Sequence, residues 1–250
     1  MRILVCNDDG IGAPGLLALA DAARMLTTDV WVVAPERKWT AASHQLSFDR
    51  DLSLTKGAGR EYACSGAPAD CVVAAMTVLF GPSVRPDLVL SGVNDKVNVG
   101  EDLAYSGTMA IAREATFWGV PAIALSADGP GAPVPRPTPA LGSLLRLLWE
   151  RRAEWWDSGC WLSLNLPPEL PAPLVQTTVG RDKIGGGCEI VEATPERTVF
   201  RIARGRPGSS TAGDERAALA AGGVAVGRHC WLTDSRLPNE TVEAWNRALS

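Results

Sequence analysis

The stretch RILVCNDDGIGAPG, residues 2–15, decides the fold of this chain. It opens with a short, nearly all-apolar run that stops at a polar turn, which is typical of a strand buried on both faces of a parallel sheet. Pro14 stands where the first turn of a helix tolerates proline, and apolar residues then recur at helical spacing as far as Leu26. We therefore predict a central strand that is followed directly by a helix.

The same alternation of apolar runs and helical segments continues through the first two thirds of the chain. Residues 30–34 form a second buried run, which completes a strand–helix–strand unit with a right-handed crossover. Further strands are predicted at 87–91, 122–125 and 161–164, and the helices that precede them at 68–79, 108–118 and about 140–152. Short strands are also expected around 46–54 and 62–64, with their pairing left open. These patterns predict an α/β fold with a doubly wound, mainly parallel sheet.

The pattern changes after residue 168, and we divide the chain there. Residues 1–168 are predicted to form the core domain, and residues 169–250 a smaller extension packed on it. The extension is expected to contain a hairpin region at 174–204, a Gly/Ser-rich stretch at 204–213, a short helix, a strand at 224–233 and a C-terminal helix. A segment rich in proline and glycine, residues 127–139, indicates a surface loop and not a linker between domains.

Composition and charge exclude several classes of protein. Among the 250 residues, 46% are hydrophobic and 21% are charged, which is typical of a soluble globular protein and excludes a mainly disordered chain. The net charge of −4 leaves no basic field for long nucleic acids, and no apolar run is long enough to span a membrane. The apolar start is too short for a signal peptide, and the six cysteines lack a C-x-x-C pair. We therefore expect a cytoplasmic protein whose cysteines are reduced core thiols.

Polar residues that follow the predicted strands are the candidates for chemistry. Parallel sheets bind ligands at the carboxyl ends of their strands, where Asn7-Asp8-Asp9-Gly10, residues 36–43 and residues 91–94 are expected to converge. Two adjacent carboxylates repel each other unless a cation compensates, and Mg²⁺ or Mn²⁺ prefers oxygen ligands of this kind. Because the chain has only two histidines, a zinc site rich in histidine is excluded. The alternative is that the aspartates only cap the following helix.

A long polar loop, residues 91–108, ends in Ser106-Gly107-Thr108 at the start of a predicted helix. Backbone N–H groups at a helix N-terminus attract anions, and the hydroxyls of Ser106 and Thr108 stand beside them. The pattern therefore predicts a phosphate site next to the metal. N-capping of the helix by Ser106 alone is the alternative.

Taken together and in this order, these segments resemble the SurE family of survival-protein nucleotidases. The strings that carry the resemblance are ILVCNDDGI at 3–11, APG at 13–15, VAP at 33–35, GAPADC at 66–71, PDLV at 86–89, SGVN at 91–94 and YSGT at 105–108. The match covers residues 1–128 well and the remainder weakly. The resemblance implies a Rossmann-like core and hydrolysis of nucleoside 5′- and 3′-monophosphates. It also implies a homodimer or homotetramer assembled through an exchanged C-terminal arm.

The resemblance also implies roles for individual residues. One divalent ion, Mg²⁺ or Mn²⁺, would be held by Asp8, Asp9, Thr40 and Asn94. The phosphate of a small nucleotide would be held by Asn98, Ser106, Gly107 and Thr108 while a water attacks phosphorus in line. Catalytic roles are expected for Asp8, Asp9, Asn98, Ser106 and Thr108, and it stays open which carboxylate acts as the base.

The chain departs from the family pattern at a few positions, which keeps two other functions open. Thr40-Ala41 stands where the family usually has serine followed by glycine or alanine, Ala67 replaces a threonine, and Lys96 replaces a glycine. One alternative is a nucleoside N-ribohydrolase, which also starts from an acidic cluster after the first strand but cleaves the glycosidic bond. The other is a nucleotide-binding regulatory protein that has lost turnover through Thr40, Ala67 and the altered C-terminal half.

Overall fold

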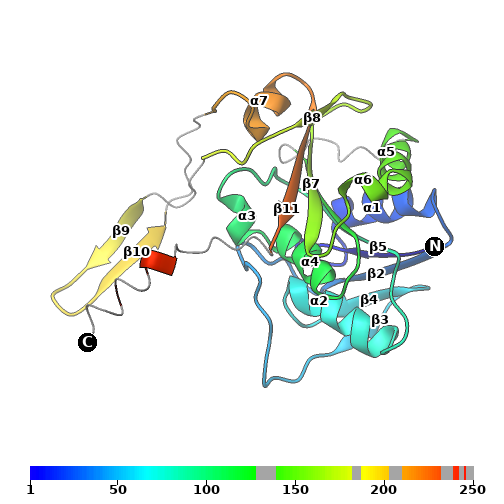
Figure 1. Ribbon diagram of the computed structural model, residues 1–250. Coiled ribbons are helices and arrows are strands. Elements are labelled where there is room, and N and C mark those ends of the chain that lie inside the picture. Colours follow the sequence, from blue (N-terminus) through cyan, green and yellow to red (C-terminus); the bar gives the residue numbers. More distant parts are fainter. Residues whose placement is uncertain (128–138, 182–186, 203–209, 232–238, 242–244, 246–250) are drawn as a thin grey trace.

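A computed structural model of the protein describes residues 1–127, 139–181, 187–202, 210–231, 239–241 and 245. Within these residues, nine strands form one sheet in the order β3-β4-β2-β1-β5-β6-β7-β11-β8 (Figure 1). The strands are β1 (Arg2–Cys6), β2 (Asp29–Pro35), β3 (Leu54–Lys56), β4 (Glu61–Cys64), β5 (Leu88–Asn94), β6 (Ala122–Ala127), β7 (Cys160–Leu166), β8 (Leu174–Gln176) and β11 (Val224–Cys230). Two further strands, β9 (Cys188–Ala193) and β10 (Thr198–Ile202), form a separate hairpin.

The helices lie on both faces of the sheet, as the sequence predicts. They are α1 (Pro14–Arg24), α2 (Pro68–Ala74) with its π-helical continuation η1 (Ala75–Leu79), α3 (Asp102–Tyr105), α4 (Gly107–Phe117), α5 (Pro139–Glu150), α6 (Arg152–Trp155) and α7 (Glu215–Ala220). Side chains of β1 alternate between two cores: Ile3 and Val5 pack with α1 and α5, whereas Leu4 and Cys6 pack with α2 and α4. This alternation confirms the predicted α/β fold with a doubly wound sheet.

The five central strands are parallel, and this arrangement brings their polar ends to one rim. β1 pairs with β2 on one side and with β5 on the other, and β6 and β7 continue the parallel series. The predicted strand positions are confirmed here within a few residues. The loops after β1, β2 and β5 therefore emerge side by side, which is what a shared site requires.

The edge next to β2 corrects one expectation from the sequence. A strand around residues 46–54 is wrong, since β3 begins only at Leu54. The preceding loop is held by side chains instead: Ser47 donates its backbone N–H to Asp70 at 3.0 Å, and Ser53 donates to Ser65 Oγ at 2.9 Å. The pairing left open by the sequence is now clear, because β4 pairs parallel with β2 and β3 pairs antiparallel with β4.

The other side of the sheet is built from residues after position 168. β11 pairs antiparallel with β7, and β8 pairs parallel with β11, so both strands extend the same sheet as the core. The division of the chain at residue 168 stays a prediction, but the sheet itself runs across it. The β9–β10 hairpin does stand apart from the body of the molecule (Figure 1).

The pairing of β7 with β11 also corrects the prediction that the cysteines are all reduced. Cys160 and Cys230 oppose each other in the register of these strands and form a disulfide. Cys6, Cys64 and Cys71 are free and buried, as expected. The disulfide joins residues 70 positions apart, so it depends on a strand pairing that the sequence alone does not reveal.

Some expectations fall on residues outside those described. These are most of the loop at 127–139, most of the Gly/Ser-rich stretch at 204–213 and most of the C-terminal helix. Among the described residues, no helix has both the length and the apolar character needed to cross a membrane.

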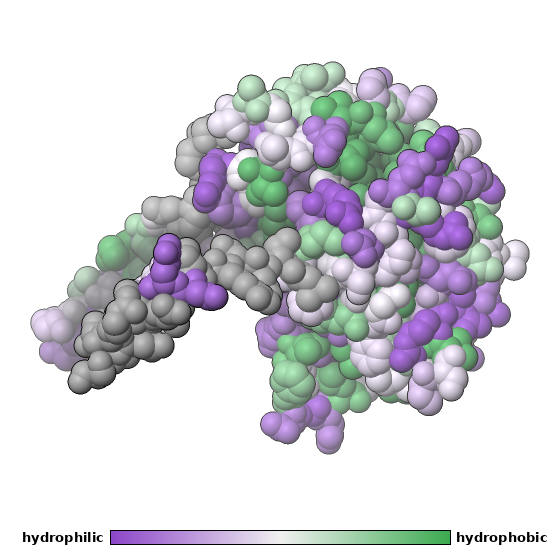
Figure 2. Space-filling view, viewed as in Figure 1, coloured by the Kyte–Doolittle hydropathy of each residue, from purple (hydrophilic) through white to green (hydrophobic). Residues whose placement is uncertain are grey.

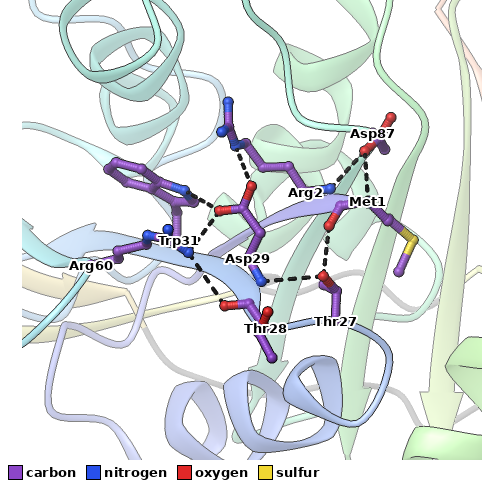
Figure 3. A network of polar contacts seen from close by, with 8 residues as sticks. All are labelled: Met1, Arg2, Thr27, Thr28, Asp29, Trp31, Arg60 and Asp87. Carbon is purple, nitrogen blue, oxygen red and sulfur yellow. Dashed lines mark hydrogen bonds and ion pairs between the residues drawn. The ribbon is translucent and has the colours of Figure 1, made fainter.

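A polar network covers the amino ends of β1 and β2 (Figure 3). Asp29 accepts from Arg2 Nε at 3.0 Å, from Arg60 Nη1 at 2.8 Å and from Trp31 Nε1 at 2.9 Å. Asp87 accepts the backbone N–H of Arg2 at 2.6 Å. Each carboxylate in this network has a donor, so the network ties the start of the sheet together.

Candidate active site at the carboxyl ends of the strands

The turn after β1 sets the positions of the two aspartates. Asn7 is fully buried, and its side chain closes the turn by donating to Gly10 O at 3.0 Å and accepting from Gly10 N at 3.2 Å. Gly10 has a φ of +106°, a conformation that favours glycine. The backbone N–H of Trp39 donates to the backbone oxygen of Asp8 at 2.7 Å, which connects this turn to the loop after β2. Asn7 is among the polar candidates after the first strand, but its structural role in the turn was not predicted, although an Asn three residues before a glycine indicates such a turn.

Asp8 lies in the buried part of the site and touches the start of α4. Only 6% of the residue is exposed, and its Oδ1 accepts from Thr108 Oγ1 at 2.6 Å. Burial raises the pKa of Asp8 to about 6, the Thr108 hydrogen bond opposes this shift, and the neighbouring Asp9 adds to it. A buried carboxylate with a raised pKa is short of positive charge, which is the electrostatic condition that a bound cation relieves.

Asp9 faces a cation from the chain itself. Lys38, in the loop after β2, contacts Asp9 Oδ1 and also lies 2.8 Å from Asp95 Oδ2. Asp95 donates its backbone N–H to Asp9 Oδ2 at 3.3 Å. Partial burial opposes charge on Lys38, but its bonds to Asp9 and Asp95 outweigh this and raise the pKa of the ammonium. Lys38 was not predicted from the sequence, although the loop after β2 was placed on the correct rim. Lys38 stands two residues before the predicted ligand Thr40.

The start of α4 is capped by Ser106 and lies beside Asp8. Ser106 is the N-cap and accepts the backbone N–H of Met109 at 3.2 Å, so the capping alternative is observed. Gly107 lies directly against Asp8, because a Cβ added to it would stand 2.7 Å from Asp8 Cβ and 2.9 Å from Asp8 Oδ2. Ser106, Gly107 and Thr108 therefore lie beside the aspartates, where the sequence placed them, and their phosphate contacts stay a prediction.

The remaining predicted residues are placed less uniformly. Asn94 is partly buried at the end of β5. Its Nδ2 donates to Lys96 O at 2.6 Å, and this bond orients the side-chain amide of Asn94. Thr40 is exposed on the rim, and the next residue, Ala41, has a φ of +54°. A left-handed alanine is strained where glycine is not, so this turn has a local cost, although alanine is one of the two residues usual at this position in the family.

Asn98 is buried, and its hydrogen bonds lead toward β6 and β7. Its Nδ2 donates to Ser126 Oγ at 2.7 Å, and its backbone N–H donates to Asn165 Oδ1 at 2.8 Å. These bonds fix the loop between β5 and α3 to the neighbouring strand ends. A role for Asn98 at the phosphate stays a prediction.

The donor set fits a hard divalent ion. Carboxylates of Asp8 and Asp9, the amide of Asn94 and the hydroxyl of Thr40 offer oxygen atoms, which suit Mg²⁺ or Mn²⁺ better than zinc. In the described part of the chain, no three or more His, Cys, Asp or Glu side chains form a cluster that fits a metal. A cation here would therefore depend on the two aspartates and on neutral oxygen donors.

Comparisons with known proteins give relatives that span this site. The family model described as Survival protein SurE matches residues 3–185. A protein named 5'-nucleotidase SurE from Paramagnetospirillum magneticum is 42% identical over 205 residues, covering 77% of this chain and 74% of that protein. 5'-nucleotidase SurE 1 from Burkholderia lata is 39% identical over 233 residues, covering 90% and 88%. The crystal structure of the SurE protein from Aquifex aeolicus superposes with a TM-score of 0.79 at 28% identity, covering 100% of this chain and 99% of that one.

Proposed function

This chain belongs to the SurE family, and from this premise we propose that the Asp8–Asp9 site hydrolyses the phosphate ester of nucleoside monophosphates. The protein is a phosphomonoesterase hydrolase, a nucleotidase, as its relatives named 5'-nucleotidase SurE support. The observation that carries the assignment to this site is the contact between Asp8 and Thr108 at 2.6 Å. It joins an acidic strand end, which suits a cation, to a helix N-terminus, which suits an anion.

The family implies a divalent metal ion, and the oxygen donors fit one. We propose a single Mg²⁺ or Mn²⁺ held by Asp8, Asp9, Asn94 and Thr40. When bound, such an ion would polarise the phosphate as a Lewis acid. Substitution of Asn94 or Thr40 is expected to weaken metal binding less than substitution of either aspartate, because neutral ligands contribute less charge.

The chain's own residues would orient the phosphate and the water. Backbone N–H groups at the start of α4, those of Gly107 and Thr108 included, are proposed to hold phosphate oxygens together with the Ser106 hydroxyl, and Asn98 is proposed to complete this set. Thr108 holds Asp8 Oδ1, whereas Oδ2 lies toward Gly107 on the side of the proposed phosphate. We assign the base to Asp8 Oδ2, which would take a proton from the attacking water.

Substitution of Asp9 tests the assignment of the site. Asp9→Ala removes a ligand and its charge and is expected to lower phosphate release about 10²–10³-fold, the size of effect typical for lost electrostatic stabilisation at a reacting group. Inorganic phosphate would be measured for a panel of nucleoside 5′- and 3′-monophosphates with Mg²⁺, Mn²⁺ and Zn²⁺. Asp21→Ala, on the exposed face of α1, is the matched control. Full activity in Asp9→Ala with a native circular dichroism spectrum would show that the site lies elsewhere.

The same panel separates the two alternative functions. An N-ribohydrolase would release free base and not phosphate. A nucleotide-binding regulatory protein that has lost turnover would bind nucleotides in calorimetry with neither product. Thr40, the missing hydroxyl at Ala67 and the altered C-terminal half are the features that an inactive protein would implicate, and Thr40→Ser would then be expected to raise turnover.

Assembly into a homodimer or homotetramer is proposed from the β9–β10 hairpin. This hairpin projects from the body and carries exposed apolar side chains, some of them visible as green surface in Figure 2. The side chains are Ile190, Val191, Phe200 and Ile202, which are 54–61% exposed. A two-stranded hairpin is marginally stable alone in water, so a second copy of the chain that covers these residues would stabilise it. Light scattering of Phe200→Glu against wild type tests this proposal.

The substrate is proposed to be a small nucleotide, with neither long nucleic acid nor membrane as partner, because the chain carries a net charge of −4.

We also propose that the protein is cytoplasmic. The buried free thiols of Cys6, Cys64 and Cys71 fit a reducing compartment, while the Cys160–Cys230 disulfide fits an oxidising one. Alkylation of free thiols in freshly lysed cells, followed by mass spectrometry, would measure the state of this pair in its own compartment.

A further inference from the structure

Lys38 joins three loops of the site through one ammonium group. It contacts Asp9, which follows β1, and lies 2.8 Å from Asp95, which follows β5. Lys38 itself comes from the loop after β2. Since β2, β1 and β5 are neighbours in the sheet, this single side chain bridges three adjacent strand ends.

The two carboxylates that Lys38 contacts are in different environments. The Asp9 side chain is only 8% exposed, whereas those of Asp95 and Lys38 are 49% and 47% exposed. Asp9 also follows Asp8, a second buried carboxylate. The contact with Asp9 therefore offsets a real electrostatic cost, and the contact with Asp95 is a solvated ion pair of small energy.

We propose that Lys38 is a built-in counter-ion that competes with the divalent metal for Asp9. The inference rests on the proposed metal site. In the metal-free protein, the ammonium neutralises Asp9 and keeps the aspartate turn in place. When a divalent cation arrives, the ammonium leaves Asp9 and stays paired with Asp95 at the rim.

The geometry explains why the two cations would exclude each other. An ammonium in direct contact with Asp9 Oδ1 blocks that oxygen as a metal ligand and repels a doubly charged ion beside it. The half-exposed Asp95 gives the ammonium a partner during the exchange, so the lysine does not have to be released into solvent. Lys38 is therefore a positioning residue, whose loss should change metal affinity before it changes any step of hydrolysis.

The experiment is calorimetric titration of Mn²⁺ into the metal-free full-length protein without nucleotide. Lys38→Met removes the competing charge and is expected to bind Mn²⁺ about 5- to 10-fold more tightly than wild type, the size expected for one charged contact. Lys38→Arg keeps a cation and is expected to bind within about twofold of wild type. Lys96→Met is the matched control, because Lys96 is an exposed lysine of the same rim and stands two residues from the proposed ligand Asn94, as Lys38 stands two residues from Thr40. It is expected to change affinity less than Lys38→Met.

A second measurement covers a folding defect. The metal-free Lys38→Met protein is expected to melt at a lower temperature than wild type, and saturating Mn²⁺ is expected to remove or reverse the difference, since a ligand stabilises the folded state according to its affinity. Lys38→Gln is the second variant if Lys38→Met does not fold. Unchanged or weaker Mn²⁺ binding in the Lys38 variants would overturn the inference, as would an equal gain in Lys96→Met. If wild type binds no Mn²⁺, or if Asp9→Ala binds it equally well, the proposed metal site itself is wrong.

Discussion

Aspartates lie at both ends of β1 and β2, and their pKa values are shifted in opposite directions. At the amino ends, Asp29 has two arginines and a tryptophan as donors (Figure 3), and these partners lower its pKa although burial opposes the shift. At the carboxyl ends, burial raises the pKa of Asp8 to about 6, and neither the Thr108 hydroxyl nor the charge of Lys38 offsets it. The same amino acid is thus satisfied at one end of the sheet and short of positive charge at the other.

This difference indicates which carboxylates take part in ligand binding and which only stabilise the fold. A carboxylate with all its donors supplied by the fold contributes to stability and has little left to offer a ligand. A buried carboxylate that lacks compensation is costly unless something binds there, and such groups gather at functional sites. The contrast predicts that changes at the carboxyl ends affect the reaction, whereas changes at the amino ends affect stability alone.

The largest effect is expected from adding one methyl group beside Asp8. In Gly107→Ala the new Cβ would lie 2.7 Å from Asp8 Cβ and 2.9 Å from Pro68 Cγ, so Asp8 must shift. Misplacing a catalytic group in this way is expected to lower kcat/KM about 10²–10³-fold, which equals about 3–4 kcal/mol of transition-state stabilisation. Phosphate release from a nucleoside monophosphate measures it.

Gly12→Ala is the control for this variant. Gly12 follows the same aspartate turn, but among the described residues no atom outside its two chain neighbours lies within 4 Å of the position of an added Cβ. Its activity is expected to stay within about twofold of wild type. Equal activity of the two variants would break the comparison, since the carboxyl ends would then tolerate a displaced Asp8.

A smaller effect, on stability, is expected from His229, near the amino end of β7. The residue opposes Trp161 in the β7–β11 pair, and burial, with a contribution from Arg113, lowers its pKa from 6.5 to about 4. Between these values the unfolded chain binds more protons than the folded one, so stability is complete above pH 6.5 and is lost as the pH falls toward 4. The loss by pH 4.5 is expected to be about 2–3 kcal/mol.

Urea denaturation from pH 4.5 to 7 measures this dependence. His229→Gln removes the titrating group and is expected to flatten the slope in that window, with kcat at pH 7 unchanged. A slope as steep as in wild type would mean that other groups govern acid unfolding.

The smallest effect is expected at the amino-end network. Asp29→Asn weakens two ion pairs. The Asp29 side chain is 30% exposed, and the side chains of its partners Arg2 and Arg60 are 29% and 48% exposed. The expected loss is about 1 kcal/mol in the free energy of unfolding, without a change in kcat, because partly exposed pairs contribute little. Thermal denaturation measures it, and Asp21→Asn, in an exposed pair with Arg24, is expected to lose less. A drop in activity of Asp29→Asn would show that the two ends of the sheet are coupled.

The parts of the site that could be predicted are those whose chemistry is local. Asp8 and Asp9 follow a buried strand, and the strand pattern placed them at the correct rim because side-chain burial repeats along the sequence. Ser106, Gly107 and Thr108 could be predicted as well, because the residues that signal the start of a helix are adjacent in the sequence. Asn98 was expected at the phosphate, but its hydrogen bonds lead to Ser126 and Asn165, on strands that the local pattern does not relate to it.

The alternation of strands and helices, the parallel core and the acidic turn that ends β1 all follow from the periodicity and turn chemistry of neighbouring residues. The pairing of β11 with β7, the disulfide between Cys160 and Cys230, and the contact of Lys38 with Asp9 are visible only in the folded molecule. Such contacts join distant segments, and their geometry depends on how separate strands come together. The charge balance around Asp9 is therefore a property of the fold.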